Sequence, residues 1–309
     1  MKIQFSFFLL LVCSFAINAQ DSIPKVSQGK IERIQNFESN YVSNRNIDVW
    51  LPETYNPKFK YAVLYMHDGQ MLYDAKSTWN KQAWNVDSAA SELINSGSIK
   101  DFIIVGIWNG GSTRHSEYFP QKPYESLSET EQDTVSKQLQ NSHVPVNDLF
   151  KPQSDNYLKF VVEELKPFID QKYSVLSDPN NTFIAGSSMG GLISMYAICE
   201  YPNIFGGAAC LSTHWTGTFT PYNNPVPKSF LDYLDQNLPN SKNHKIYFDT
   251  GDQSLDSLYP NIQRKVDTIL EKNGFSDNNW ITKYFPGEDH SENAWSKRIH
   301  IPLEFLLHK

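Results

Sequence analysis

The fold is decided by residues 182–191, which read Thr-Phe-Ile-Ala-Gly-Ser-Ser-Met-Gly-Gly. A short apolar run with strand character leads into a turn of small residues, and residues 192–198 continue as an apolar helix. Residues 186–190 fit G-x-S-x-G, in which a serine occupies a sharp turn between strand and helix. The flanking glycines are needed because strand and helix pass too closely for side chains. The pattern predicts that Ser188 is a nucleophile.

The helix that follows this serine predicts a second feature of the site. Because the helix starts at Ser188, the amide of Met189 should point toward the oxygen of a reacting carbonyl. A Gly/Ser turn without chemistry is the alternative, since a five-residue match arises by chance in many chains. The strand before it and the helix after it favour the catalytic interpretation.

The totals of the chain set limits on what it can be. Its 309 residues are 40% hydrophobic and 14% aromatic, which is enough for one sizeable core. We therefore expect a single domain over residues 20–309. The net charge of −7 gives no electrostatic support for binding nucleic acid.

The N-terminus has the pattern of a secretory signal peptide over residues 1–19. Lys2 precedes an apolar run, residues 5–16, and Ala19 suits the cleavage position. The run is too short for a comfortable membrane span, so we expect no span after cleavage. Cys13 lies inside the run and follows Val12, which does not suit a lipid-attachment site. These features predict export to the periplasm or the extracellular space.

Apolar strands closed by turns alternate with helices along most of the chain. This alternation predicts a mostly parallel central sheet with helices on both faces. The expected strands are 31–38, 45–51, 61–67, 102–108, 182–187, 207–212, 245–250 and 280–285, and the expected helices are 85–93, 155–173, 189–198, 230–238, 261–272 and 294–307. Residues 109–153 show neither the periodicity of a helix nor that of a strand. Such a segment is either the roof of an active site or a variable surface loop.

A serine nucleophile needs a base, and the base needs a carboxylate that orients it. In the α/β-hydrolase arrangement the three follow in the order Ser, Asp/Glu, His, each after a sheet strand. His290 follows the last expected strand and is the candidate base. Asp249, Asp252 and Asp256 follow the strand at 245–250. Asp256 is preferred because it lies far enough along the loop after the strand to reach the histidine, and because it precedes a helix whose dipole favours its charge. Asp252 remains the alternative.

Several further residues are assigned expected roles. The amide of Gln70, beside Gly69, is the candidate second oxyanion donor. No metal site is expected, because residues 252–256 lack calcium-loop spacing and the two later cysteines do not pair with histidines. Cys199 and Cys210 read as small buried side chains, although export would permit a disulfide.

Four segments together resemble the esterase D / putative esterase family of α/β-hydrolases. They are Leu-Tyr-Met-His-Asp-Gly-Gln at 64–70, Gly-Ser-Ser-Met-Gly-Gly at 186–191, Leu-Ser-Thr-His-Trp at 211–215 and Gly-Glu-Asp-His at 287–290. The resemblance covers roughly residues 31–307 and implies an α/β-hydrolase fold, Ser188 as nucleophile, His290 as base and no cofactor. The family often carries the acid three residues after a strand-end glycine. That position is Ser254 here, so the resemblance leaves the acid open.

The family takes in feruloyl and acetyl-xylan esterases, enterochelin-esterase-like hydrolases and mycolyltransferases. We therefore expect a secreted or periplasmic serine carboxylic-ester hydrolase that acts on acetyl or feruloyl esters of plant polysaccharide. The candidate substrate contacts are Trp215, His214, Arg114 and Tyr118, since aromatic faces suit sugar rings and feruloyl groups. The alternatives are a siderophore-ester hydrolase, an acyltransferase, or a catalytically silent carbohydrate-binding protein. The oligomeric state stays open.

Overall fold

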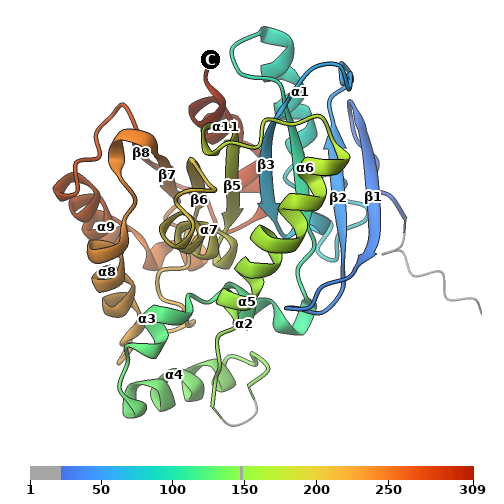
Figure 1. Cartoon of the computed structure of the whole chain (residues 1–309). Coiled ribbons are helices and arrows are strands. Elements are labelled where there is room, and N and C mark those ends of the chain that lie inside the picture. The colour runs from blue at the N-terminus through green and yellow to red at the C-terminus, as the bar shows by residue number, and fades with distance from the viewer. Residues whose placement is uncertain (1–21, 147–148) are drawn as a thin grey trace, which may run out of the picture.

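The computed structural model describes residues 22–146 and 149–309, so the predicted signal peptide lies outside the described residues. This part of the chain forms an eight-stranded sheet in the order β1-β2-β4-β3-β5-β6-β7-β8 (Figure 1). Strand β2 is antiparallel to both of its neighbours, and all pairs from β4 to β8 are parallel. The strands are β1 Lys30–Phe37, β2 Arg45–Leu51, β3 Ala62–His67, β4 Phe102–Ile107, β5 Thr182–Ser187, β6 Gly207–Leu211, β7 Lys245–Thr250 and β8 Trp280–Tyr284.

Helices cover the sheet on both faces, which confirms the predicted α/β-hydrolase architecture. One core lies between the sheet and α5, α6, α7, α8 and α9, and a second lies between the sheet and α1, α10 and α11. The helices are α1 Val86–Ser96, α2 Arg114–Tyr118, α3 Gln121–Glu125, α4 Glu129–Asn141, α5 Ser154–Lys159, α6 Lys166–Lys172, α7 Met189–Glu200, α8 Val226–Asn237, α9 Pro260–Lys272, α10 Glu292–Ser296 and α11 His300–Leu307. A π-helical turn, Phe160–Leu165, joins α5 to α6.

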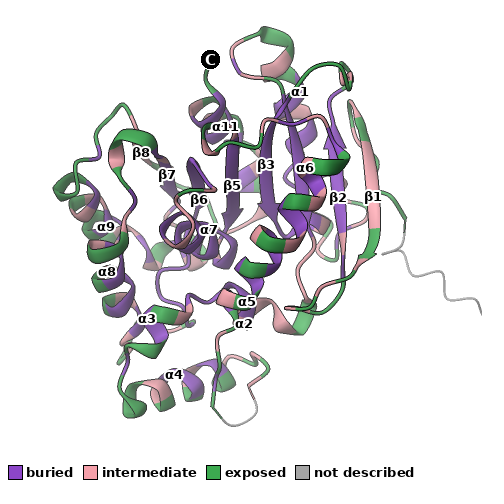
Figure 2. Ribbon diagram, in the orientation of Figure 1, coloured by how far each residue is buried: buried purple, intermediate pink, exposed green. Residues whose placement is uncertain are grey.

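The central strands are buried on both sides, and this explains their continuous apolar sequences. Along β5, Ile184 packs into the first core while Phe183 and Ala185 pack into the second. Every residue of β3, β4 and β5 is buried (Figure 2). Because the parallel strands point the same way, the turns after β3, β5, β6, β7 and β8 meet at one edge of the sheet.

The structure corrects the prediction that residues 109–153 lack regular structure. This segment contains α2, α3 and α4. Ser128 and Glu131 form a capping box at the start of α4, and Val135 and Leu139 bury its apolar side. The helix escaped detection because its polar composition hides so narrow an apolar stripe. The expected helix at 294–307 is also interrupted, since α10 ends at Ser296 and α11 begins at His300.

Candidate active site

Ser188 occupies a strained turn between β5 and α7. Its φ and ψ angles are 57° and −122°, a conformation that is costly for any residue with a side chain. Backbone hydrogen bonds hold it: Ser188 N–H donates to Leu211 O at 3.0 Å, and Ser188 O accepts from the N–H groups of Leu192 and His214, both at 3.1 Å. A Cβ at Gly186 would lie 2.7 Å from the backbone of Gly190, so the glycine is required sterically. The tight turn presents the serine at the sheet edge.

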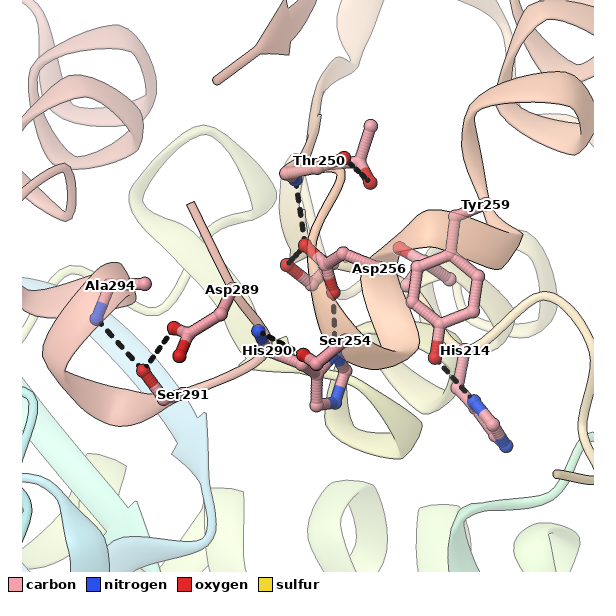
Figure 3. Close-up of polar contacts among 12 residues, drawn as sticks. His214, Thr250, Ser254, Asp256, Tyr259, Asp289, His290, Ser291 and Ala294 are labelled. Atoms are coloured by element: carbon pink, nitrogen blue, oxygen red, sulfur yellow. Dashed lines mark hydrogen bonds and ion pairs between the residues drawn. The ribbon is translucent and has the colours of Figure 1, made fainter. Parts of the chain in front are cut away.

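A carboxylate–imidazole pair lies on the loops after β7 and β8. The Nδ1 of His290 donates to Asp256 Oδ1 at 2.5 Å (Figure 3). The other oxygen of Asp256 accepts from Ser212 Oγ at 2.6 Å and from the amide of Gly251 at 2.7 Å. Asp256 is fully buried, while the His290 side chain keeps 13% of its surface exposed. The imidazole is thereby fixed with its second nitrogen available.

The other two acidic candidates serve different contacts. Asp252 is half-buried and accepts hydrogen bonds from Tyr284 Oη at 2.6 Å and the Gly287 amide at 2.9 Å. Asp249 is buried in an ion pair with Arg298, at 3.0 Å. Ser254, at the position where the family often has its acid, accepts the His290 backbone N–H at 3.0 Å. Of the four side chains, only Asp256 is hydrogen-bonded to the His290 ring.

A buried network stands behind the carboxylate of Asp256. Besides donating to Asp256, Ser212 Oγ accepts from Trp295 Nε1 at 3.0 Å and from Arg298 Nη2 at 2.9 Å. Arg298 in turn binds Asp249 through two nitrogens. Ser212 has a φ of 42°, which turns its hydroxyl into this position at some conformational cost. No sequence pattern pointed to Ser212, Trp295 and Arg298, because their contacts join residues more than forty positions apart.

The turn after β3 carries Gln70 and is fixed by a second polar cluster. Asp68 receives two hydrogen bonds from Arg114, both 2.7 Å long, and one from Asn109 at 2.7 Å. Burial opposes ionisation of Asp68, but Arg114 outweighs it and holds the pKa of the carboxyl below its usual value. The backbone N–H of Asn109 donates to Gln70 Oε1 at 3.2 Å. Gln70 lies in the single turn of 3-10 helix Gly69–Met71 and Met189 is the first residue of α7, positions where a backbone N–H has no acceptor within its own helix.

These groups meet in one cleft of about 480 Å³. Its lining includes Ser188, His290, Gln70 and Arg114. The other lining side chains are Asp68, Met71, Trp79, Asn80, Gln82, Trp84, Asn109, Ser187, Ser291, Glu292 and Trp295. A larger hollow of about 780 Å³ lies beside residues 25–27, 73–76 and α1, but none of the predicted site residues lines it. The smaller cleft is therefore the candidate active site.

Three of the four predicted substrate contacts are corrected by the structure. Trp215, His214 and Tyr118 are fully buried and do not line the cleft. Trp215 donates to Gln263 at 2.8 Å, and His214 is hydrogen-bonded to Tyr259 Oη at 2.6 Å. A position at a strand end puts a residue near the sheet edge but does not say whether its side chain points in or out. The fourth residue, Arg114, does line the cleft.

The helical segment after β4 is not the roof of this cleft. From residues 109–153, only Asn109 and Arg114 line it among the described residues. Helix α4 instead contacts the loop after β6, because Gln138 donates to the carbonyls of Tyr222 and Asn223. Figure 1 shows α4 at one end of the molecule, beyond α3.

The two cysteines of the described chain are free and buried, as the sequence analysis expected. Burial raises the pKa of the Cys199 and Cys210 thiols, so both are unreactive as thiolates. The described residues contain no cluster of three or more His, Cys, Asp or Glu side chains able to hold a metal ion. Nor does any helix in residues 22–146 and 149–309 have the length and apolarity to cross a membrane.

Comparison with known proteins identifies the family. A family model described as "Putative esterase" matches residues 39–300, and the chain belongs to this esterase family. Family membership makes it a carboxylic-ester hydrolase. Endo-1,4-beta-xylanase/feruloyl esterase from Xylanibacter ruminicola is 24% identical over 236 residues, which is 72% of this chain and 27% of that longer protein.

Solved structures share the fold. A CE1 ferulic acid esterase from Anaeromyces mucronatus, solved with ferulic acid, superposes with a TM-score of 0.60 at 19% identity and covers 93% of this chain and 94% of its own. The enterobactin esterase FES from Shigella flexneri superposes with a TM-score of 0.60 at 16% identity, over 93% of this chain and 62% of that one.

Proposed function

We propose that this esterase works through a catalytic triad of Ser188, His290 and Asp256. The observation that carries the proposal is the Asp256–His290 hydrogen bond, which orients an imidazole in the same cleft as the strained Ser188. The buried carboxylate fixes the ring and stabilises the imidazolium that forms when His290 accepts a proton. The order Ser, Asp, His along the chain is that of α/β-hydrolases.

The proposed reaction has two halves. His290 accepts the hydroxyl proton of Ser188 while the serine oxygen attacks the ester carbonyl, and the amides of Met189 and Gln70 donate to the resulting oxyanion. His290 then protonates the leaving alkoxide, and an acyl-enzyme remains. A water molecule then gives a proton to His290 and attacks the acyl group. His290 returns that proton to the Ser188 oxygen as the acyl–serine bond breaks, which releases the carboxylic acid and restores the free enzyme.

We further propose acetyl or feruloyl esters of plant polysaccharide as substrates, with export after removal of residues 1–19. The support is the likeness to the xylanase/feruloyl esterase and to the ferulic acid esterase. The likeness to enterobactin esterase makes siderophore-ester hydrolysis the second candidate.

Labelling with a fluorophosphonate probe tests the triad. We expect label on the native protein and none on Ser188→Ala, while unlabelled native protein would contradict a serine hydrolase and favour a carbohydrate-binding protein on the same fold. Turnover of acetylated xylan, methyl ferulate and a catecholate siderophore ester then separates the substrate classes. Activity on the siderophore ester alone would overturn the polysaccharide assignment. N-terminal sequencing of the exported protein checks cleavage after Ala19.

A further inference from the structure

Trp79 is an unusual residue in the cleft because its side chain is almost bare. It is 84% exposed, the largest exposed fraction among the big apolar side chains of the described chain. An indole left in water forgoes the burial that normally stabilises a side chain of its size. Yet Trp79 lines the same cleft as Ser188 and His290. An exposed aromatic face beside a reactive centre is available for contact with substrate.

The cleft has two chemically different parts. Met71, Trp84 and Trp295 are buried, and the rings of Trp84 and Trp295 pack 5.4 Å apart. The Trp295 ring also meets the His290 ring edge-on at 5.0 Å. This apolar wall beside the imidazole suits the acyl group of an ester.

The surroundings of Trp79 are polar instead. Asn80 donates to Glu292 at 2.8 Å, and Gln82 accepts from the backbone of residue 293 at 3.3 Å, so both amides are held in place at the cleft. A flat aromatic face bordered by fixed amides and a carboxylate suits a pyranose or furanose ring. Such a ring stacks its C–H groups on the indole while its hydroxyls exchange hydrogen bonds with the amides.

We propose that Trp79, with Asn80, Gln82 and Glu292, binds the sugar that carries the ester. The proposal rests on the proposed function, because it assigns the leaving-group side of the same cleft to carbohydrate. It makes Trp79 a specificity-determining residue that lowers KM for glycosyl esters and takes no part in bond breaking. An enclosed slot would be expected for a feruloyl ring, and the high exposure of Trp79 argues against that use.

The test compares two esters with the same acyl group. For a feruloylated arabinoxylan oligosaccharide, Trp79→Ala should raise KM about 5- to 20-fold with kcat little changed, whereas KM for methyl ferulate should stay within about twofold. Trp79→Phe should recover part of the loss. Tyr222→Ala is the matched control, because Tyr222 is 79% exposed and does not line the cleft. An equal rise in KM for both esters would place the acyl group on Trp79, and no rise for either would remove its role; both overturn the proposal.

Two controls separate this proposal from the proposed function. The fluorophosphonate probe carries neither a sugar nor an aromatic leaving group, so labelling of Trp79→Ala reports on the triad independently of the sugar site. Binding of ester-free arabinoxylan oligosaccharide to Ser188→Ala, followed by tryptophan fluorescence, needs no catalysis. It should be lost in the Ser188→Ala/Trp79→Ala double variant. Failure of the oligosaccharide to bind Ser188→Ala would overturn the sugar site even where esterase activity is intact.

Discussion

The two sides of the cleft are built in opposite ways. On the acid–base side, Asp256 and His290 are backed by Ser212, Arg298 and Asp249, and these three supporting side chains are fully or almost fully buried. On the rim, formed by residues 68–82 and Arg114, side chains range from buried to nearly bare. The groups proposed for acid–base chemistry are thus fixed by buried partners. Trp79, proposed for recognition, is almost fully exposed, so its replacement should disturb little of the surrounding packing.

Exchanging Asp256 and Asp252 separately for asparagine tests whether the acid–base side depends on its buried carboxylate. Asp256→Asn should lower kcat/KM by about 10²- to 10⁴-fold, because the amide no longer holds the imidazole in the required tautomer. Asp252→Asn should change it less than about threefold, since Asp252 bonds to Tyr284 and makes no hydrogen bond to the His290 ring. Steady-state kinetics on 4-nitrophenyl acetate gives both numbers. A larger loss at Asp252 would show that the acid is misassigned.

The buried network predicts a smaller loss for Ser212→Ala, about tenfold in kcat. Without the Ser212 hydroxyl, the carboxylate of Asp256 loses one of the two donors that hold its second oxygen, so the imidazole of His290 should be oriented less firmly. Ser257→Ala, an exposed serine on the same loop, is the control. An unchanged kcat would reduce Ser212 to a packing role.

On the rim, Arg114→Lys should lower kcat by about three- to tenfold, which is less than the loss expected for Ser212→Ala. Lysine cannot reproduce the two parallel hydrogen bonds to Asp68, so the turn that carries Gln70 should be held less firmly. Because the expected defect is in oxyanion binding, kcat should fall more than KM rises. Arg264→Lys, on the exposed face of α9, controls for the general effect of the exchange. A loss confined to KM would make Arg114 a substrate contact instead.

The smallest effect on activity at neutral pH is expected from a substitution of His67. This side chain is buried and hydrogen-bonded to Tyr157. Burial lowers its pKa to about 3 from a usual value of 6.5. Between these pH values the unfolded chain binds a proton that the folded chain does not. The free energy of unfolding should therefore fall as pH drops through this window, with a slope approaching about 1.4 kcal/mol per pH unit. Urea unfolding of the native protein and of His67→Asn at several pH values measures how the free energy of unfolding depends on pH. Equal slopes for the two proteins would contradict the lowered pKa of His67.

Much of the fold was predictable because it rests on local patterns. The strands of the parallel sheet are buried on both faces, so their apolar runs stand out, and the expected strand at 245–250 coincides with β7. The elbow and its flanking elements follow from spacing, and the order of the three candidate groups follows from the order of the strand ends. The preference for Asp256 over Asp252 rested on loop reach, and Asp256 is the one hydrogen-bonded to His290.

What could not be predicted depends on contacts distant in sequence or on side-chain direction. Ser212 joins residues that lie 44 and 86 positions away, and no local signal connects them. Trp79 lies in a stretch without periodicity, so its exposure could not be inferred. The start of α4, by contrast, could have been predicted from the sequence, because Ser128 and Glu131 have the spacing of a capping box.

The loops that carry Asp256 and His290 are joined to each other through their backbones. The amides of Asp252 and Gln253 both donate to Glu288 O at 3.1 Å, and a Cβ at Gly251 would lie 2.1 Å from that same oxygen. Neither loop can change length or path without the other. In a chimaera with another esterase of this family, residues 251–258 and 285–291 therefore have to come from the same parent. A crossover between them would separate two halves of one inherited unit.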